Sequence, residues 1–129
     1  MQALIRRLGA EISVWADVDV KHASPLAHRP IGDLAADAIE RGLAGAVIVT
    51  GGGTGQPVAG SDLRAVREAL PSAPIYIGSW ARADTVADLL READGVIVGT
   101  AAKVDGIVTN RVDLERVRAI VQAARRRDP

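Results

Sequence analysis

Two kinds of hydrophobic pattern alternate along this chain. Short apolar runs end in glycine or in a polar cluster, and each is followed by a longer stretch whose apolar positions recur with helical spacing. A short apolar run predicts a buried strand, and the 3.6-residue period predicts an amphipathic helix. The predicted strands are Ile12–Val18, Ala44–Thr50, Pro74–Gly78 and Gly95–Gly99, and the predicted helices are Ile31–Leu43, Ser61–Leu70, Ala83–Ala93 and Asp113–Ala124. Strands that alternate with helices in this way indicate an α/β fold with a parallel sheet.

The number of units indicates the architecture. Four βα units are half of the eight in a closed barrel, so we predict a single (βα)4 half-barrel domain over residues 1–129. Right-handed crossovers keep all helices on one side of the sheet, which leaves the other face bare and both edge strands unpaired. Because bare faces and open edges are liabilities, we expect a second copy of the chain to cover them. The sequence therefore predicts a homodimer or a higher homo-oligomer.

The first predicted strand and the residues ahead of it carry two further patterns. Leu4, Ile5 and Leu8 are spaced like one turn of a helix that ends at Gly9, as expected of a piece cut from a longer chain. The stretch Val14–Lys21 then alternates strictly between apolar and mainly polar positions. Period two places the two sets on opposite faces of a strand. The face with Trp15, Asp17, Asp19 and Lys21 is expected to look into a barrel interior or an interface.

Composition narrows the class of protein. Hydrophobic residues make up 48% of the chain and charged residues 25%, which is ordinary for a globular protein. Sixteen basic and sixteen acidic residues cancel, so there is no electrostatic footprint for nucleic acid or an anionic membrane. No apolar run approaches the roughly 20 residues of a membrane span, and no signal peptide is recognisable. With no cysteine in the chain, these features favour a cytoplasmic protein without membrane insertion.

Polar residues and glycines follow the predicted strands, where βα barrels build their active sites. Gly78-Ser79 and Gly99-Thr100 end the last two strands, with Lys103 close behind. Glycine lets a ligand approach the backbone, and the two hydroxyls add donors, so this pair of loops is a candidate phosphate site. Thr50, Gly51 and Thr54 belong to a glycine-rich loop without a Walker motif, which either closes on a ligand or is a long turn. The alternative for all these glycines is that they only turn the chain.

The densest polar cluster comprises Asp17, Asp19, Lys21 and His22. Paired carboxylates beside a lysine suggest acid–base chemistry, and these four residues are the catalytic candidates. The alternative is an interior set of ion pairs that stabilises the barrel, in which loss of one partner would cost about 3–5 kcal/mol. A Schiff base on Lys21 is a further alternative. Two carboxylates and one histidine are too few to define a metal site, so we predict no metal and no cofactor.

These motifs together resemble the BtpA/SgcQ family. The segments that carry the resemblance are Asp17-Val18-Asp19-Val20-Lys21-His22-Ala23, Ile48-Val49-Thr50-Gly51 with Thr54-Gly55, Gly78-Ser79, and Asp94-Gly95-Val96-Ile97-Val98-Gly99-Thr100 with Lys103, Asp105-Gly106 and Val112-Asp113. The resemblance implies a TIM barrel similar to the ribulose-phosphate-binding barrels, of which this chain would be the second half. It also implies a phosphorylated small ligand, but it supplies no reaction. The chain departs from the family in lacking the first four βα units and in having Trp80 where a glycine is usual; this indole could crowd a phosphate or plug the rim.

Three hypotheses for function follow. The first is a barrel that binds a phosphorylated small molecule at the carboxyl ends of its strands, with its status as an enzyme left open. The second is a non-catalytic accessory protein that acts through protein contacts, since one namesake of the family is linked to photosystem I biogenesis while another is encoded with sugar-uptake genes. The third is an excised or engineered half-barrel without activity of its own.

Overall fold

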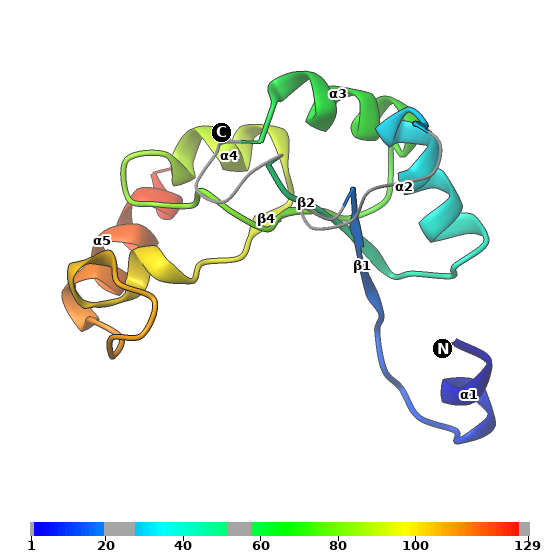
Figure 1. Ribbon diagram of the computed structural model, residues 1–129, viewed down its shortest axis with the longest axis horizontal. Coiled ribbons are helices and arrows are strands. Elements are labelled where there is room, and N and C mark those ends of the chain that lie inside the picture. The colour runs from blue at the N-terminus through cyan, green and yellow to red at the C-terminus, as the bar shows by residue number, and fades with distance from the viewer. Residues whose placement is uncertain (1, 20–27, 52–57, 127–129) are drawn as a thin grey trace.

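The computed structural model describes residues 2–19, 28–51 and 58–126, in which helices and strands alternate as the sequence predicts (Figure 1). In chain order the elements are α1 (Gln2–Arg7), β1 (Trp15–Val18), α2 (Ile31–Glu40), β2 (Ala46–Val49), α3 (Gly60–Ala69), β3 (Ile75–Ile77), α4 (Val86–Glu92), β4 (Gly95–Val96), the short 3-10 helices η1 (Thr100–Ala102) and η2 (Val104–Gly106), and α5 (Leu114–Arg125). The two 3-10 helices are additions that the hydrophobic pattern does not predict.

The strands form one parallel sheet in the order β1-β2-β3-β4. Sequential order with every strand parallel is the arrangement of successive βα units in a barrel wall. Helices α2, α3 and α4 gather on one side of the sheet (Figure 1). The predicted α/β half-barrel with parallel strands is therefore confirmed.

The hydrophobic core lies between the sheet and these helices. Alternate strand residues point toward the helices, and the fully buried ones include Val47, Val49, Ile75 and Ile77. They pack with helix residues that the 3.6-residue period selected, among them Ala35, Leu63 and Val66. Helices α2 and α3 approach closely where Gly32 faces α3, because a Cβ on that glycine would lie 2.9 Å from the carbonyl oxygen of Ala65.

Some strands and helices begin or end at other residues than predicted, and left-handed backbone conformations coincide with two of these ends. Strand β1 ends at Val18 because Asp19 adopts a left-handed conformation, with φ at 57°, so the predicted alternation stops before Asp19. Helix α2 ends at Glu40 rather than Leu43, whose φ is 54°. Helix α3 begins at Gly60 rather than Ser61, with Ala59 at the capping position, and no side chain caps that helix.

The two ends of the described chain are less enclosed than its centre. Helix α1 stands away from the sheet on an extended arm, and α5 lies at the opposite end of the molecule (Figure 1). Asp113 caps α5, since its carboxylate accepts hydrogen bonds from the backbone N–H groups of Glu115 and Arg116. Ile120 is the buried residue of α5, whereas Leu114 on the same helix is 59% exposed.

Candidate functional site

An open pocket of about 730 Å³ lies at the carboxyl ends of β3 and β4, beside helix α5. The loops that follow these two strands contribute Gly78, Ser79, Gly99 and Thr100, all of which the sequence selected as candidate ligand residues. The remaining wall is formed by Trp80, Ala81, Arg82, Ala83, Asp84, Ile97, Ala101, Gly106, Arg116, Ala119 and Ile120. The ends of β3 and β4, which are about twenty residues apart in sequence, thus line the same pocket as helix α5.

The two glycines at this site differ in what surrounds them. A Cβ added to Gly99 would meet no atom within 4 Å, so a side chain there would enter open space beside the pocket. A Cβ added to Gly78 would overlap Cγ2 of Thr50 and lie 2.8 Å from Cγ2 of Ile48. Gly78 therefore makes room for neighbouring side chains in the sheet, and Gly99 leaves the backbone accessible to a ligand.

Arg116 brings a positive charge to the pocket from the first turn of α5. Its Nη1 donates to the carbonyl oxygen of Ala101 at 3.4 Å, which ties the helix to the segment after β4. Because Asp113 already accepts from the first backbone N–H groups of α5, an anion in the pocket would meet the guanidinium rather than the end of the helix. A cation so near a helix N-terminus is unfavourable for the helix dipole.

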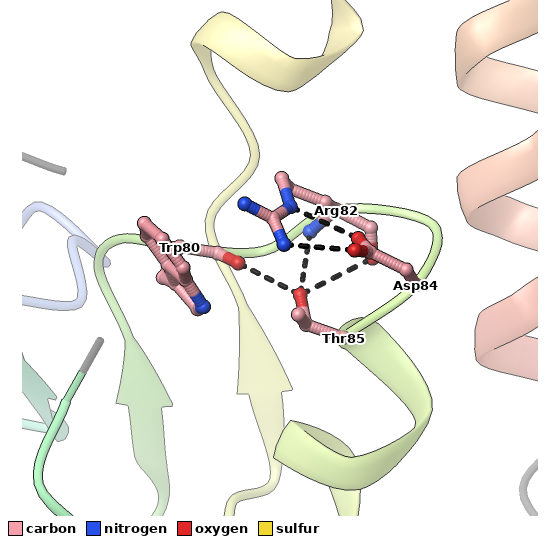
Figure 2. A network of polar contacts seen from close by, with 4 residues as sticks. All are labelled: Trp80, Arg82, Asp84 and Thr85. Atoms are coloured by element: carbon pink, nitrogen blue, oxygen red, sulfur yellow. Dashed lines mark hydrogen bonds and ion pairs between the residues drawn. The ribbon is translucent and has the colours of Figure 1, made fainter. Parts of the chain in front are cut away.

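The loop between β3 and α4 is fixed by a network of four residues (Figure 2). The Thr85 hydroxyl donates to the carbonyl oxygen of Trp80 at 2.8 Å and accepts from the backbone N–H of Arg82 at 3.1 Å. Arg82 donates from Nε and Nη2 to the two carboxylate oxygens of Asp84 at 2.9 and 2.8 Å, and its guanidinium carbon lies 4.4 Å from the centre of the Trp80 ring. Trp80 has a φ of 68°, a conformation that favours glycine, which explains why glycine suits this position.

The same network shifts the ionisation of its charged members. The hydrogen bonds that Arg82 donates lower the pKa of Asp84, and the same bonds raise the pKa of Arg82. Both groups are therefore charged at neutral pH, and the pairing is lost only as the pH falls through the lowered pKa of Asp84. A guanidinium has five N–H donors in a planar fork. Arg82 thus keeps donors available for a ligand while Asp84 and Trp80 fix its orientation.

Other candidate residues lie along the same edge of the sheet. The Thr50 hydroxyl donates to Oδ1 of Asp17 at 3.1 Å, which joins the end of β2 to β1. The backbone N–H of Gly51 donates to Oγ of Ser79 at 3.3 Å, which joins the end of β2 to the loop after β3. Ser79 therefore connects the pocket to the strand ends on its other side.

Two further candidates among the described residues, Lys103 and Asp19, do not line this pocket. Lys103 pairs with Val112 in an antiparallel bridge and is not among the lining residues. Asp19 is exposed beyond the end of β1. Lys21, His22 and Thr54 lie outside the described residues. Within residues 2–19, 28–51 and 58–126, no group of three or more His, Asp or Glu residues could hold a metal ion.

The exposure of Asp17 changes the expected cost of removing it. In the single chain this carboxylate is exposed and its described partner is the Thr50 hydroxyl, so the cost expected for the single chain is smaller than that of breaking a buried ion pair in a closed barrel. We expect Asp17→Ala to lower the free energy of unfolding by about 0.5–1.5 kcal/mol, the net value of one hydrogen bond. Urea melts of Asp17→Ala, Thr50→Val and the double variant measure the coupling. A loss above 3 kcal/mol would contradict this expectation and favour a buried charge.

Sequence reasoning missed both arginines of the pocket. Arg116 carried a usable signal, since it stands three residues after the capping Asp113, in a helix turn where a cation is disfavoured. Arg82 had no such signal, because its position depends on the left-handed backbone at Trp80 and on the pairing with Asp84.

Comparison with known proteins identifies relatives over nearly the whole chain. A family model described as the BtpA family matches residues 2–126. An uncharacterised protein of Thermococcus kodakarensis is 45% identical over 95% of this chain. The photosystem I biogenesis protein BtpA of Synechocystis is 38% identical over 92% of it, and an uncharacterised protein of Methanocaldococcus jannaschii is 39% identical over 94%.

The relatives are about twice as long as this chain. The matched region covers 46%, 41% and 45% of those three proteins, respectively. No solved structure matches the chain significantly. In the part of the chain that the structure describes, no helix is both long and apolar enough to span a membrane.

Proposed function

This chain belongs to the BtpA family, and from that premise we propose that it binds a phosphorylated small molecule in the pocket at the carboxyl ends of β3 and β4. The observation that supports the proposal most is the meeting of Ser79, Gly99 and Thr100, from two separate loops, in one hollow with Arg116. In βα barrels the loops after the last two strands commonly hold phosphate.

The lining residues suit the two parts of such a ligand. Phosphate oxygens accept hydrogen bonds, which the Ser79 and Thr100 hydroxyls and the two guanidiniums can donate. Arginine binds phosphate with two parallel bonds, which adds orientation as well as energy. The remaining wall includes Ile97 and Ile120, which suit the less polar body of the molecule. A volume of about 730 Å³ lies within the range of small-molecule sites and leaves room for more than inorganic phosphate.

Acid–base chemistry on the ligand, where it occurs, is assigned in this proposal to the polar cluster that follows β1. Asp17 lies on the same edge of the sheet and is joined to Thr50, while Asp19, Lys21 and His22 follow it in sequence. Of the remaining ligand candidates, Thr50, Gly51 and Thr54 are proposed to contact the body of the molecule, whereas Lys103 lies outside the pocket lining.

A second candidate function rests on the name of one relative. The Synechocystis protein is called a photosystem I biogenesis protein, which favours an accessory role in the assembly of another complex. Such a role requires contacts with a protein rather than a phosphate site, so the two candidates differ in their response to phosphate.

The test is thermal unfolding in phosphate against chloride of matched ionic strength. A site specific to the folded state adds about 1.4 kcal/mol of stability at ten times its Kd, a gain of a few degrees in Tm. We expect Arg116→Gln to weaken phosphate binding by tenfold or more, on the order of the energy of one charged hydrogen bond. Arg118→Gln is the matched control, because Arg118 pairs with Glu115 on the same helix and does not line the pocket.

Three outcomes are informative. A gain in wild type and Arg118→Gln that is absent in Arg116→Gln supports the proposal. An equal gain in all three proteins would show that phosphate acts elsewhere. No gain in any of them would favour the accessory role.

A further inference from the structure

The face of the sheet away from the helices is open and mainly apolar, with Asp17 as a charged member. The strand register places Trp15, Ile48 and Tyr76 on this face, opposite the side that α2, α3 and α4 cover (Figure 1). Trp15 and Tyr76 stack across β2 with ring centres 4.1 Å apart, yet Trp15 remains 46% exposed. Ile97, which continues the alternation after β4, is also exposed. Large apolar side chains gathered on one uncovered face mark an interaction surface.

Two further surfaces flank this face at the edges of the sheet. Strands β1 and β4 are the edge strands, each with one neighbour among the described strands. On the arm that precedes β1, Leu4 and Leu8 in and just after α1 are 57% and 71% exposed. Beside the β4 edge, Leu114 of α5 is exposed in the same way, as is Val121 on the same helix. We look for a single binding partner that covers the open face, both edge strands and the exposed apolar side chains of α1 and α5.

We propose that a second copy of this chain occupies this face and closes an eight-stranded barrel. A two-fold axis parallel to the strands brings β4 of each copy beside β1 of the other, keeps all strands parallel and removes both edges. At each seam, where β4 of one copy lies beside β1 of the other, α1 of one copy comes close to α5 of its partner, because α1 precedes β1 and α5 follows β4. The relatives, of which this chain covers 41–46%, contain about the amount of chain that two copies supply. The inference does not rest on the proposed phosphate site, although Ile97 belongs both to the pocket wall and to the open face.

The inner face is suited to that role. The interior of an eight-stranded barrel is filled by side chains, chiefly bulky ones. Trp15, Ile48, Tyr76 and Ile97 supply such side chains from all four strands or their ends. Gly95 leaves the space that the Tyr76 ring occupies, since a Cβ there would lie 2.5 Å from Cε1 of that ring. We expect an interface made of a whole sheet face and two strand edges to exceed the roughly 1,000 Å² that a stable complex needs.

Light scattering coupled to size exclusion should give twice the 13.5 kDa mass of the chain. Trp15→Asp should shift the protein to a monomer, because it places a charge in the closed interior. Leu43→Asp is the matched control, with similar exposure at 44% but a position outside the open face and edges, and it should remain dimeric. A folded wild-type monomer, or a dimer that Trp15→Asp leaves intact, would overturn the proposal.

Cross-linking tests the seam without depending on Trp15→Asp folding. The chain has no cysteine, so Leu8→Cys and Val121→Cys each introduce a single thiol. A bismaleimide should join the two variants when they are mixed and allowed to exchange, since α1 and α5 lie at opposite ends of one chain and meet only across a seam (Figure 1). Each variant alone should join far less. Equal joining in the mixture and in the separate variants would contradict the arrangement.

Discussion

Replacing Ile77 by alanine is expected to lower the free energy of unfolding by about 2–5 kcal/mol, enough to unfold much of a marginally stable protein. Ile77 is fully buried at the centre of the core, on β3 between two neighbouring strands. The loss combines the transfer energy of the missing methyl groups with the cavity that the rigid sheet and helices leave behind. Urea unfolding followed by circular dichroism gives the change in midpoint and slope.

Ile107→Ala removes the same atoms from a position that is 49% exposed, after η2 and outside the pocket. It should cost less than about 1 kcal/mol, because most of that side chain already contacts water. Equal losses in the two variants would show that the side of the sheet assigned to the core is wrong.

Replacing Gly99 by leucine is expected to abolish stabilisation by phosphate while leaving the free energy of unfolding nearly unchanged. No atom lies within 4 Å of the Cβ that this change adds, so the side chain does not clash with the protein. It enters the space beside the pocket and blocks approach to the backbone between β4 and η1. The measurement is the difference in Tm between phosphate and chloride at matched ionic strength.

The control for this variant is Gly60→Leu, at the first residue of α3. Its added Cβ also meets no atom within 4 Å, and Gly60 does not line the pocket. It should keep the full phosphate response. If Gly99→Leu responds to phosphate as the wild type does, the ligand does not use this loop.

The order of strands and helices could be predicted because each depends on the period of its own residues. Apolar positions such as Val47, Val49 and Ile75 are buried for the same reason that they were recognised as strand residues. The ends of the elements could not be predicted in this way. Asp19 and Leu43 take left-handed conformations, and these depend on contacts beyond the local pattern.

Some residues of the candidate site could likewise be predicted from the sequence, and others could not. Ser79, Gly99 and Thr100 could be selected from sequence because the carboxyl ends of parallel strands meet at one edge of the sheet. The pocket's charges could not be assigned, since Arg82 is oriented by Asp84 and the Trp80 ring, and Arg116 reaches the pocket from the far end of the chain. Asp17 was selected as a catalytic candidate, with a buried set of ion pairs as the alternative; it is exposed in the single chain, and its burial in an assembly depends on what covers the open face.

Titration of the isotopically labelled protein with inorganic phosphate tests most directly whether phosphate binds at the carboxyl ends of β3 and β4. Amide resonances in a proton–nitrogen correlation spectrum report each site separately. We expect saturable shifts at Gly78, Ser79, Gly99 and Thr100, with Gly60 and the other amides of α3 unmoved. Shifts that do not saturate, or that centre away from these four residues, would contradict it.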